Sequence, residues 1–316
     1  MTNKEKYHQL CQTADIPIFS KDWWLDIVCG KKNWEVLLIE EKGEIKGTMP
    51  IYRPLSRCIT MPSYTQNMGP WLAPEAADCK YTTLLGRRQQ LLKQFIRQLP
   101  ATNSFLQNFS YSITDWLPFY WAGFQQTTRY TYLLNGIKDQ ERLLAGMATN
   151  IRRNIQKAKE KYKIEVRRDV PIEDFLKVQD QTFQRQHIKN KSDQQALINL
   201  MKVSRQRGQG DIWGGYDPQG RLHAAVFVVW QNSSAYYIAG GGNPELRSSG
   251  THSLVLWESI RFVSQYTDTF DFEGSMIPGV ERFFREFGAK QTPYFTINKG
   301  KMSFKDRVLL KLKRSL

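Results

Sequence analysis

The feature that most limits how this chain can fold is a segment, 222–231, with no polar face. Residues 224–230 read Ala-Ala-Val-Phe-Val-Val-Trp. A strand with one face in water alternates apolar and polar residues, so an unbroken apolar run predicts a strand that is covered on both faces. The chain is therefore expected to place other elements on both sides of a sheet.

The segments around this strand alternate between helical and extended patterns. The predicted elements of the second half are a helix at 143–162 with a basic stripe, a strand at 164–168, helices opening at Pro171 and Asp193, strands at 212–216, 222–231 and 235–239, a glycine-rich loop at 240–250, a helix at 251–266, a strand at 269–273, a helix at 280–287 and a strand at 294–297. This order predicts a mixed α/β fold whose sheet is antiparallel on one side.

The first half repeats this order less clearly. Strands are predicted at 34–39, 45–52 and 105–111, and a helix at 84–99. Both halves end alike. An aromatic segment with a glycine, 119–124, precedes a strand at 125–133, and a similar segment, 283–288, precedes a strand at 289–297. We interpret this as a duplicated unit divided into residues 1–138 and 139–316, with chance similarity as the alternative.

Composition limits the function classes. No apolar run is long enough to span a membrane and the start is polar, so a cytoplasmic protein is expected. The four cysteines and four histidines are scattered, which predicts free thiols and no metal site. No known DNA- or RNA-binding motif is present, so no DNA partner is expected.

The net charge of +15 is concentrated in two segments. Residues 149–168 hold eight basic and two acidic side chains, and residues 299–316 hold seven basic and one acidic. Such local fields attract phosphates, nucleic acid or an anionic lipid surface, although solvated helix faces would show the same pattern. The tail, 301–316, mixes leucines with basic residues, which is typical of a helix that contacts a membrane surface or packs with a charged outer face.

The glycine-rich loop is the most informative place for chemistry. Three glycines end a strand, and the chain then reaches a helix start, whose free N–H groups and dipole favour an anion such as a pyrophosphate. The candidate donor-binding residues are Gly240, Gly241, Arg247, Ser249, Gly250 and Thr251. A glycine-rich turn capped by Ser249 or Thr251 is the alternative.

The spacing Arg247-x-x-Gly250-x-His252 resembles the pyrophosphate-binding motif of the GNAT superfamily of acyl-CoA N-acyltransferases, with His252 where that motif has a small residue. Four further segments resemble the FemAB-like branch, which includes enzymes that build peptidoglycan interpeptide bridges. They are 64–71 (Tyr-Thr-Gln-Asn-Met-Gly-Pro-Trp), 152–158 (Arg-Arg-Asn-Ile-Gln-Lys-Ala), 270–275 (Phe-Asp-Phe-Glu-Gly-Ser) and 278–288. The resemblance spans both halves.

This resemblance implies tandem GNAT-like units, each a mixed, mostly antiparallel sheet flanked by helices. The acyl donor is expected on the second unit (139–316), and the acceptor on the side of the first (1–138). The candidate substrate-binding residues are Gln66, Arg152, Arg153, Lys157 and Tyr237. Arg152, Arg153 and Lys157 would grip a diphosphate of the acceptor or a tRNA backbone, or they form a plain solvated stripe.

The expected reaction is attack of an amine on an ester or thioester carbonyl. A backbone N–H near 239–241 would stabilise the oxyanion, and a carboxylate would take the proton of the amine. Asp271 and Glu273 are the candidate bases, because they alternate along one predicted strand and would share a face. Glu273 is preferred because Gly274 indicates an open strand end; otherwise one carboxylate holds a loop or pairs with Arg282.

Three functions follow. The first is an acyltransferase that uses acyl-CoA to modify an amine of a small or lipid-linked acceptor in cell-envelope biosynthesis. The second is a ligase that uses aminoacyl-tRNA to extend peptidoglycan precursors, and His252 favours it. The third is a non-catalytic module that binds RNA or the inner face of the cell membrane. No metal is expected in any of them.

Overall fold

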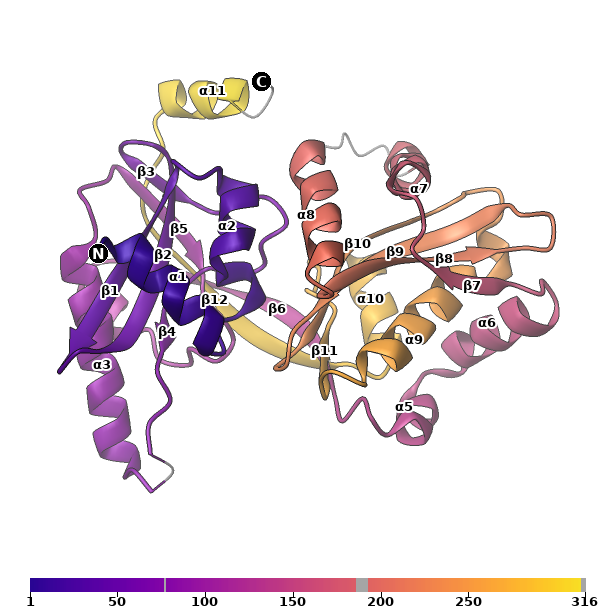
Figure 1. Ribbon diagram of the computed structural model, residues 1–316, viewed down its shortest axis with the longest axis horizontal. Helices are drawn as coiled ribbons and strands as arrows, with labels where there is room; N and C mark the ends of the chain where they lie inside the picture. Colours follow the sequence, from indigo (N-terminus) through magenta and orange to yellow (C-terminus); the bar gives the residue numbers. More distant parts are fainter. Residues whose placement is uncertain (77, 186–192, 314–316) are drawn as a thin grey trace. The chain divides into compact units, whose positions relative to one another are not determined.

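The computed structural model describes residues 1–76, 78–185 and 193–313 (Figure 1). The contacts divide the chain into two compact units: unit 1 is Met1–Arg129 with Pro293–Leu316, and unit 2 is Tyr130–Thr292. The predicted division assigned all of 139–316 to one unit. In the structure the chain passes from unit 1 to unit 2 between residues 129 and 130, and it returns to unit 1 between residues 292 and 293.

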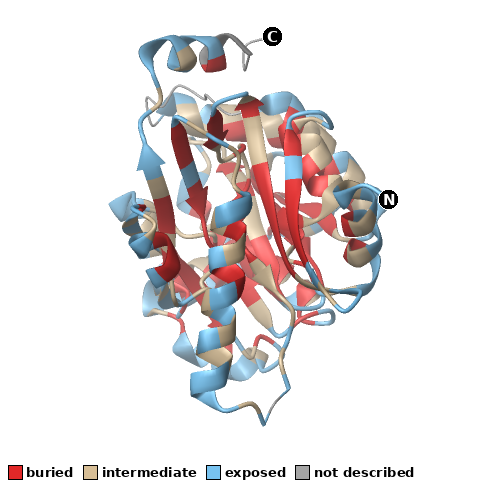
Figure 2. Ribbon diagram, turned by 90° about the vertical axis from the view of Figure 1, so that its left-hand side faces the viewer, coloured by how far each residue is buried: buried red, intermediate tan, exposed pale blue. Residues whose placement is uncertain are grey.

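Unit 1 is built on a sheet whose strands follow the order β1-β2-β3-β5-β12. These strands are Trp34–Glu41 (β1), Glu44–Leu55 (β2), Cys58–Thr60 (β3), Ser104–Asn108 (β5) and Lys290–Gly300 (β12), with Trp71–Leu72 (β4) paired to β2. Its helices are Asn3–Thr13 (α1), Asp22–Cys29 (α2), Tyr81–Gln98 (α3), Leu117–Trp121 (α4) and Phe304–Lys313 (α11). Figure 2 shows the strands largely buried, whereas the helices keep exposed faces.

Unit 2 has the strand order β6-β11-β10-β9-β8-β7. These strands are Gln125–Asn135 (β6), Glu165–Arg168 (β7), Gly210–Tyr216 (β8), Leu222–Trp230 (β9), Ala235–Gly242 (β10) and Thr269–Asp271 (β11). Its helices are Gln140–Gly146 (α5), Thr149–Glu160 (α6), Ile172–Arg185 (α7), Gln194–Gln206 (α8), Thr251–Val263 (α9) and Pro278–Glu286 (α10). Most of the pairs are antiparallel, as predicted.

The apolar segment forms β9, and the prediction that both of its faces are covered is confirmed. Residues His223–Trp230 are all buried. A Cβ on Gly241 would meet the backbone of Gln179 in α7, whereas a Cβ on Gly215 would meet Thr251 and Val255 in α9. Gly241 pairs with Ala225 of β9, and Gly215 pairs with Ala224. Because Ala224 and Ala225 are neighbours in the strand, they point to opposite faces of the sheet, and so do the two glycine positions that pair with them. Helices α7 and α9 therefore lie on opposite faces of the sheet.

The strand that ends each half of the sequence pairs with the sheet of the other unit. Strand β6 pairs with β11 of unit 2 through Asp271↔Leu133 and Thr269↔Asn135. Strand β12, in turn, pairs with β5 of unit 1. Each unit is thus completed by a strand that follows the aromatic segment of the other half of the sequence.

Some predicted elements were wrong in detail. The single helix expected at 143–162 is two helices, α5 and α6, because Met147 and Ala148 are extended and the Ala148 N–H donates to the Glu286 carbonyl. The three glycines do not form a loop, since β10 continues through them to Gly242. No helix in the described part of the chain is long and apolar enough to cross a bilayer.

Candidate active site

The parallel strands β10 and β11 separate soon after they meet. They pair at only two positions, Ala235↔Phe270 and Tyr236↔Asp271. Beyond Asp271 strand β11 ends, while β10 continues to Gly242. A β-bulge between Tyr237 and Ala239 interrupts the pairing of β10 with β9 at the same level. Beyond Tyr236 the backbone of β10 therefore has no strand partner on its β11 side among the described residues.

A cavity of about 460 Å³ lies beside this part of β10. Its walls come from β9, β10, the loop before α9, the first turn of α9 and helices α6, α7 and α10. They include Asn154, Thr182, Arg185, His223, Tyr237, Gly240, Gly241, Gly242, Arg247, Ser249, Gly250, Thr251, His252, Ser253, Val280, Phe283 and Phe284. All six predicted donor-binding residues therefore line one cavity, and so does Tyr237.

The glycines of this site are required because other parts of the protein pack closely against them. From the sequence we expected another reason, that a ligand approaches the backbone closely. A Cβ on Gly241 would lie 2.5 Å from the backbone of Gln179, and a Cβ on Gly240 would collide with the Tyr237 hydroxyl. Gly250 has φ +80°, and its Cβ would lie 2.7 Å from the Asn154 carbonyl oxygen. Larger residues would displace α7, Tyr237 or α6.

The start of α9 offers an anion few hydroxyl groups. Ser249 is fully buried, and its Oγ lies 2.7 Å from the Thr251 hydroxyl, so both hydroxyls already bond within the protein. Arg247 and Arg185 are exposed at the cavity, and neither pairs with a carboxylate in the described ranges. Their guanidinium groups are thus the free cations that an anionic donor would meet.

His252 lies in the first turn of α9, next to Tyr237. The Tyr237 hydroxyl is 3.5 Å from Nε2 of His252, and the ring of Phe283 packs against the imidazole at a centroid distance of 5.5 Å. Burial lowers the pKa of His252 to about 4, so the imidazole is neutral at pH 7. A neutral ring at this helix start occupies space without adding charge.

The two predicted bases have different surroundings. Asp271 is fully buried at the end of β11, and its Oδ1 accepts from the Thr131 hydroxyl and, at 2.7 Å, from the Glu273 N–H. Glu273 follows the strand with φ +60°, so the expected alternation along one strand is wrong at this position. Asp271 thus holds the backbone turn that places Glu273.

Glu273 is the better candidate base. Its Oε1 is buried and has no hydrogen-bond partner among the described residues. Burial raises the pKa of Glu273 well above its usual value, and the charge of Asp271 adds to the rise. Burial and then the charge of Glu273 raise the pKa of the Tyr237 phenol. Glu273 is not itself a wall of the cavity; it follows the end of β11, the strand that pairs with β10 at Tyr236.

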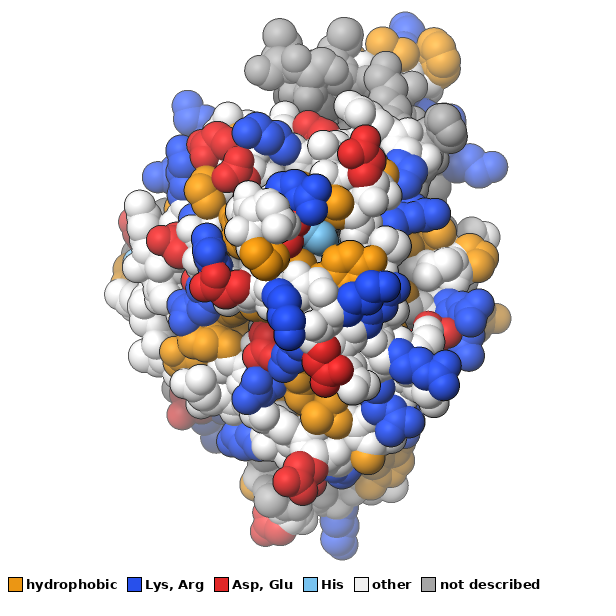
Figure 3. Space-filling view, turned by 90° about the vertical axis from the view of Figure 1, so that its right-hand side faces the viewer, with side chains coloured by type: hydrophobic (Ala, Val, Ile, Leu, Met, Phe, Trp, Pro, Cys, Tyr) orange, Lys and Arg blue, Asp and Glu red, His pale blue; other side chains and the backbone are white. Residues whose placement is uncertain are grey.

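The other predicted substrate contacts lie outside the cavity wall. Arg152 and Arg153 are exposed on α6, and Lys157 faces the ring of Tyr162 at 5.9 Å. Figure 3, which views the side where α6 and β7 lie, shows basic side chains spread over this face with acidic and apolar ones between them. Gln66 is buried in unit 1, where its Oε1 accepts from Asn67. Binding of substrate by these residues stays a prediction.

Three titratable residues that line the cavity were not predicted from the sequence: His252, Arg185 and His223. His252 was noted only as a departure from a motif, although its place at a helix start was already a signal. Arg185 lies at the end of α7, and nothing in the sequence indicates which way that end faces. His223 is isolated in the apolar strand, and a lone polar residue in such a strand is a usable signal of a buried contact.

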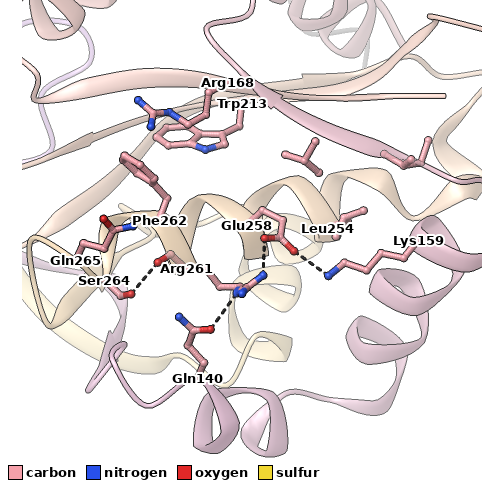
Figure 4. Close-up of a pocket in the computed structure, with 12 residues that line it drawn as sticks. Gln140, Lys159, Arg168, Trp213, Leu254, Glu258, Arg261, Phe262, Ser264 and Gln265 are labelled. Atoms are coloured by element: carbon pink, nitrogen blue, oxygen red, sulfur yellow. Dashed lines mark hydrogen bonds and ion pairs between the residues drawn. The ribbon is translucent and has the colours of Figure 1, made fainter. Parts of the chain in front are cut away.

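A second cavity of about 560 Å³ lies between β7, β8 and α9 (Figure 4). Lys159 and Arg261 both pair with Glu258, each at 2.8 Å. Arg168 stacks on the ring of Phe262 at 3.8 Å and pairs with Asp211. Because the basic groups here are already paired or stacked, we take the first cavity as the candidate active site.

A family comparison agrees with this choice. Residues 145–285 match the family described as an acetyltransferase (GNAT) domain. Every wall of the first cavity lies in this range. The chain carries a GNAT acyltransferase domain. No curated protein sequence matches the chain.

Solved structures share the whole fold at low sequence identity. FemX superposes with a TM-score of 0.70 at 11% identity, covering 99% of both chains. The L-PGS of Bacillus licheniformis gives 0.56 at 9% identity, covering 99% of this chain and 96% of that one. A tandem GNAT protein from the clavulanic acid biosynthesis pathway gives 0.50 at 9% identity, covering 89% and 95%. The predicted tandem GNAT-like fold of the FemAB-like kind is therefore confirmed.

Proposed function

We propose that this GNAT acyltransferase takes its acyl group from an acyl-CoA held in the first cavity and transfers it to an amine. The observation that carries the proposal is the cavity itself, which opens where β10 leaves β11 and ends at the start of α9. Arg247 and Arg185 would contact the phosphates of the donor, and the unpaired part of β10 would bond its extended arm.

The chemistry follows from the groups at the strand ends. The amine nitrogen forms a bond to the thioester carbonyl carbon, and the carbon–sulfur bond then breaks, so that coenzyme A leaves as the thiol. In its ionised form Glu273 accepts the proton that the neutral amine loses as it attacks, and this proton then passes to the leaving sulfur; a carboxylate with a raised pKa is matched to that transfer. A backbone N–H at the β10 bulge, near Ala239, would stabilise the oxyanion.

We further propose a cell-envelope precursor as the acceptor. The FemAB-like segments support this assignment, and so does the fold shared with FemX and L-PGS. Arg152, Arg153 and Lys157 of α6 would meet the phosphates of this acceptor. Such an acceptor would be presented to the protein at the cytoplasmic face of the membrane.

The helix α11 supports contact with a lipid surface. Phe304, Val308 and Leu309 expose 79%, 40% and 49% of their surfaces, and Lys305 and Arg307 are exposed beside them. Exposed apolar residues that alternate with basic ones suit an anionic membrane. In a vesicle sedimentation assay, the protein should bind phosphatidylglycerol vesicles and not phosphatidylcholine vesicles. The double change Val308→Ser with Leu309→Ser should abolish this binding; binding that survives it would refute the assignment.

A second donor, aminoacyl-tRNA, is favoured by one observation. His252 occupies the helix start where the GNAT motif has a small residue, and its ring packs between Tyr237 and Phe283. The ring takes space from a pyrophosphate on the backbone N–H groups. An aminoacyl ester would place only its adenosine and aminoacyl group in the cavity.

The two donors are separated by direct binding. Isothermal titration with acetyl-CoA and with a stable aminoacyl-adenosine analogue should show which one binds, and Arg247→Ala should weaken that binding about tenfold or more. Arg167→Ala, which removes an exposed arginine of β7, is the matched control. If neither ligand binds, or if both arginine variants bind as the wild type does, the donor assignment fails.

A further inference from the structure

A chain of buried hydrogen bonds runs from the turn between β8 and β9 to the start of α9. Asp217 Oδ2 lies 3.0 Å from Nε2 of His223, and Nδ1 of His223 lies 3.0 Å from the Ser249 Oγ. Ser249 Oγ in turn lies 2.7 Å from the Thr251 hydroxyl and 3.3 Å from the Thr251 N–H. The first two residues are distant in sequence from the loop that they reach.

The surroundings of Asp217 determine which atom donates and which accepts in each of these hydrogen bonds. Its oxygens accept from the backbone N–H groups of Gln219 and Arg221, from the Arg221 guanidinium and from His223. Burial alone would raise its pKa, but the hydrogen bonds from His223 and Arg221 hold the pKa of Asp217 well below its usual value. Asp217 is therefore a carboxylate and accepts from His223, so the Nε2 of His223 carries the proton.

For the neutral imidazole the directions of the remaining hydrogen bonds follow from that one. With the proton on Nε2, the Nδ1 atom is an acceptor, so the Ser249 hydroxyl donates to it. The Oγ of Ser249 is then left as the acceptor for the Thr251 hydroxyl. Each hydroxyl in the chain has one defined direction, which fixes the rotamer of Ser249.

Burial strengthens the hydrogen bonds that join Asp217, His223, Ser249 and Thr251. His223 is 2% exposed, Ser249 0% and Thr251 2%. Hydrogen bonds away from water are strengthened, and a partner left alone there costs its full desolvation. Ser249 lies between two residues that line the site, because the exposed Arg247 precedes it by two residues and the partly buried His252 follows Thr251. Fixing Ser249 and Thr251 therefore fixes both sides of the helix start.

We propose that Asp217, His223 and Ser249 are positioning residues of the donor site, which hold the loop 247–250 so that Arg247 and the first turn of α9 face the cavity. This inference rests on the proposed donor site. Ser249 is too well covered to act as a nucleophile itself. Its replacement by alanine would leave Nδ1 of His223 and the Thr251 hydroxyl without their partner, and the loop would lose its anchor.

The test compares two buried serines of unit 2. Ser259 is also fully buried, but within the described ranges its hydroxyl bonds only to the Leu256 carbonyl, one turn back in α9. Ser249→Ala should raise the KM for the donor about tenfold and change kcat less than about twofold, which corresponds to losing one buried hydrogen-bond anchor. Ser259→Ala should change neither. Hydrogen exchange of the ligand-free protein should be faster at residues 247–252 only in Ser249→Ala.

The outcomes separate the inference from the proposed function. Unchanged exchange and unchanged KM in a folded Ser249→Ala protein would overturn the positioning role. Faster exchange with an unchanged KM would show that the loop is anchored but does not bind the donor, which overturns the donor site as well. Asp217→Asn serves as the second variant, since it keeps the shape and removes the charge. It should shift the proton on His223, seen in the nitrogen chemical shifts of the imidazole; unshifted signals would overturn the proton assignment.

Discussion

Replacing Glu273 by glutamine removes a proton-binding group that the fold keeps neutral well above the usual pKa of a glutamate. The Oε1 atom is buried without a hydrogen-bond partner among the described residues, and burial followed by the charge of Asp271 raises the pKa of Glu273. Glutamine has nearly the same shape and does not titrate. The variant therefore isolates the cost of ionising this one buried carboxyl.

The magnitude follows from proton linkage. Between the unfolded pKa of a glutamate, about 4.3, and the raised pKa of the native state, the native protein binds one more proton than the unfolded protein. The free energy of unfolding of the wild type then falls by about 1.4 kcal/mol for each pH unit from this group, whereas Glu273→Gln has no such term. The stability of the variant relative to wild type should thus rise with pH across this window and level off above the native pKa.

Urea unfolding at pH 5, 6, 7 and 8 would measure this difference. Glu245→Gln, which removes an exposed carboxylate, is the control for the change in net charge. Parallel stability curves for wild type and Glu273→Gln would refute the claim that burial raises the pKa of Glu273. In the transfer assay at a pH above the native pKa of Glu273, where the side chain is a carboxylate, the same variant should lower kcat about a hundredfold or more if Glu273 is the base.

Three further changes test other parts of the structure. Gly274→Ala should lower the free energy of unfolding by about 2 kcal/mol or more, measured by urea unfolding, because φ is +66° and the new Cβ would collide with the Tyr130 carbonyl oxygen. Phe227→Ala should cost about 3–5 kcal/mol in the same assay, since Phe227 is fully buried in β9. His252→Ala should tighten acetyl-CoA binding in titration calorimetry, because it clears the helix start; weaker binding would show that the imidazole itself contacts the donor.

Local patterns in the sequence predicted those elements whose cause is local. The strand β9 is apolar throughout because both of its faces are covered, and the Asp193 side chain begins α8 by accepting from the Ala196 N–H, as the sequence indicated. The helix α1 was missed although its signal was present, since Thr2 and Glu5 form a capping box. The break before α6 depends on the Glu286 carbonyl, which is far away in sequence.

The pairing of β6 with the sheet of unit 2 and of β12 with the sheet of unit 1 could not be predicted either, because it also depends on contacts between residues that are far apart in sequence. Both strands follow similar aromatic segments, so the sequence does not say which sheet each one completes; the pairing is a property of the whole fold. In the site, the loop and the helix start were found from glycine, arginine and capping signals. The chain from Asp217 to Ser249 was not, because three separate segments supply its members and only the folded sheet brings them together.

The most direct test of the donor site is a crystal structure of the protein with a non-reactive acyl-CoA analogue or with the aminoacyl-adenosine analogue. The ligand should lie beside β10 in the first cavity, with a phosphate or ribose oxygen within hydrogen-bond distance of Arg247 and the reacting carbonyl near Ala239. A saturated ligand bound elsewhere, with the first cavity holding only water, would contradict this assignment.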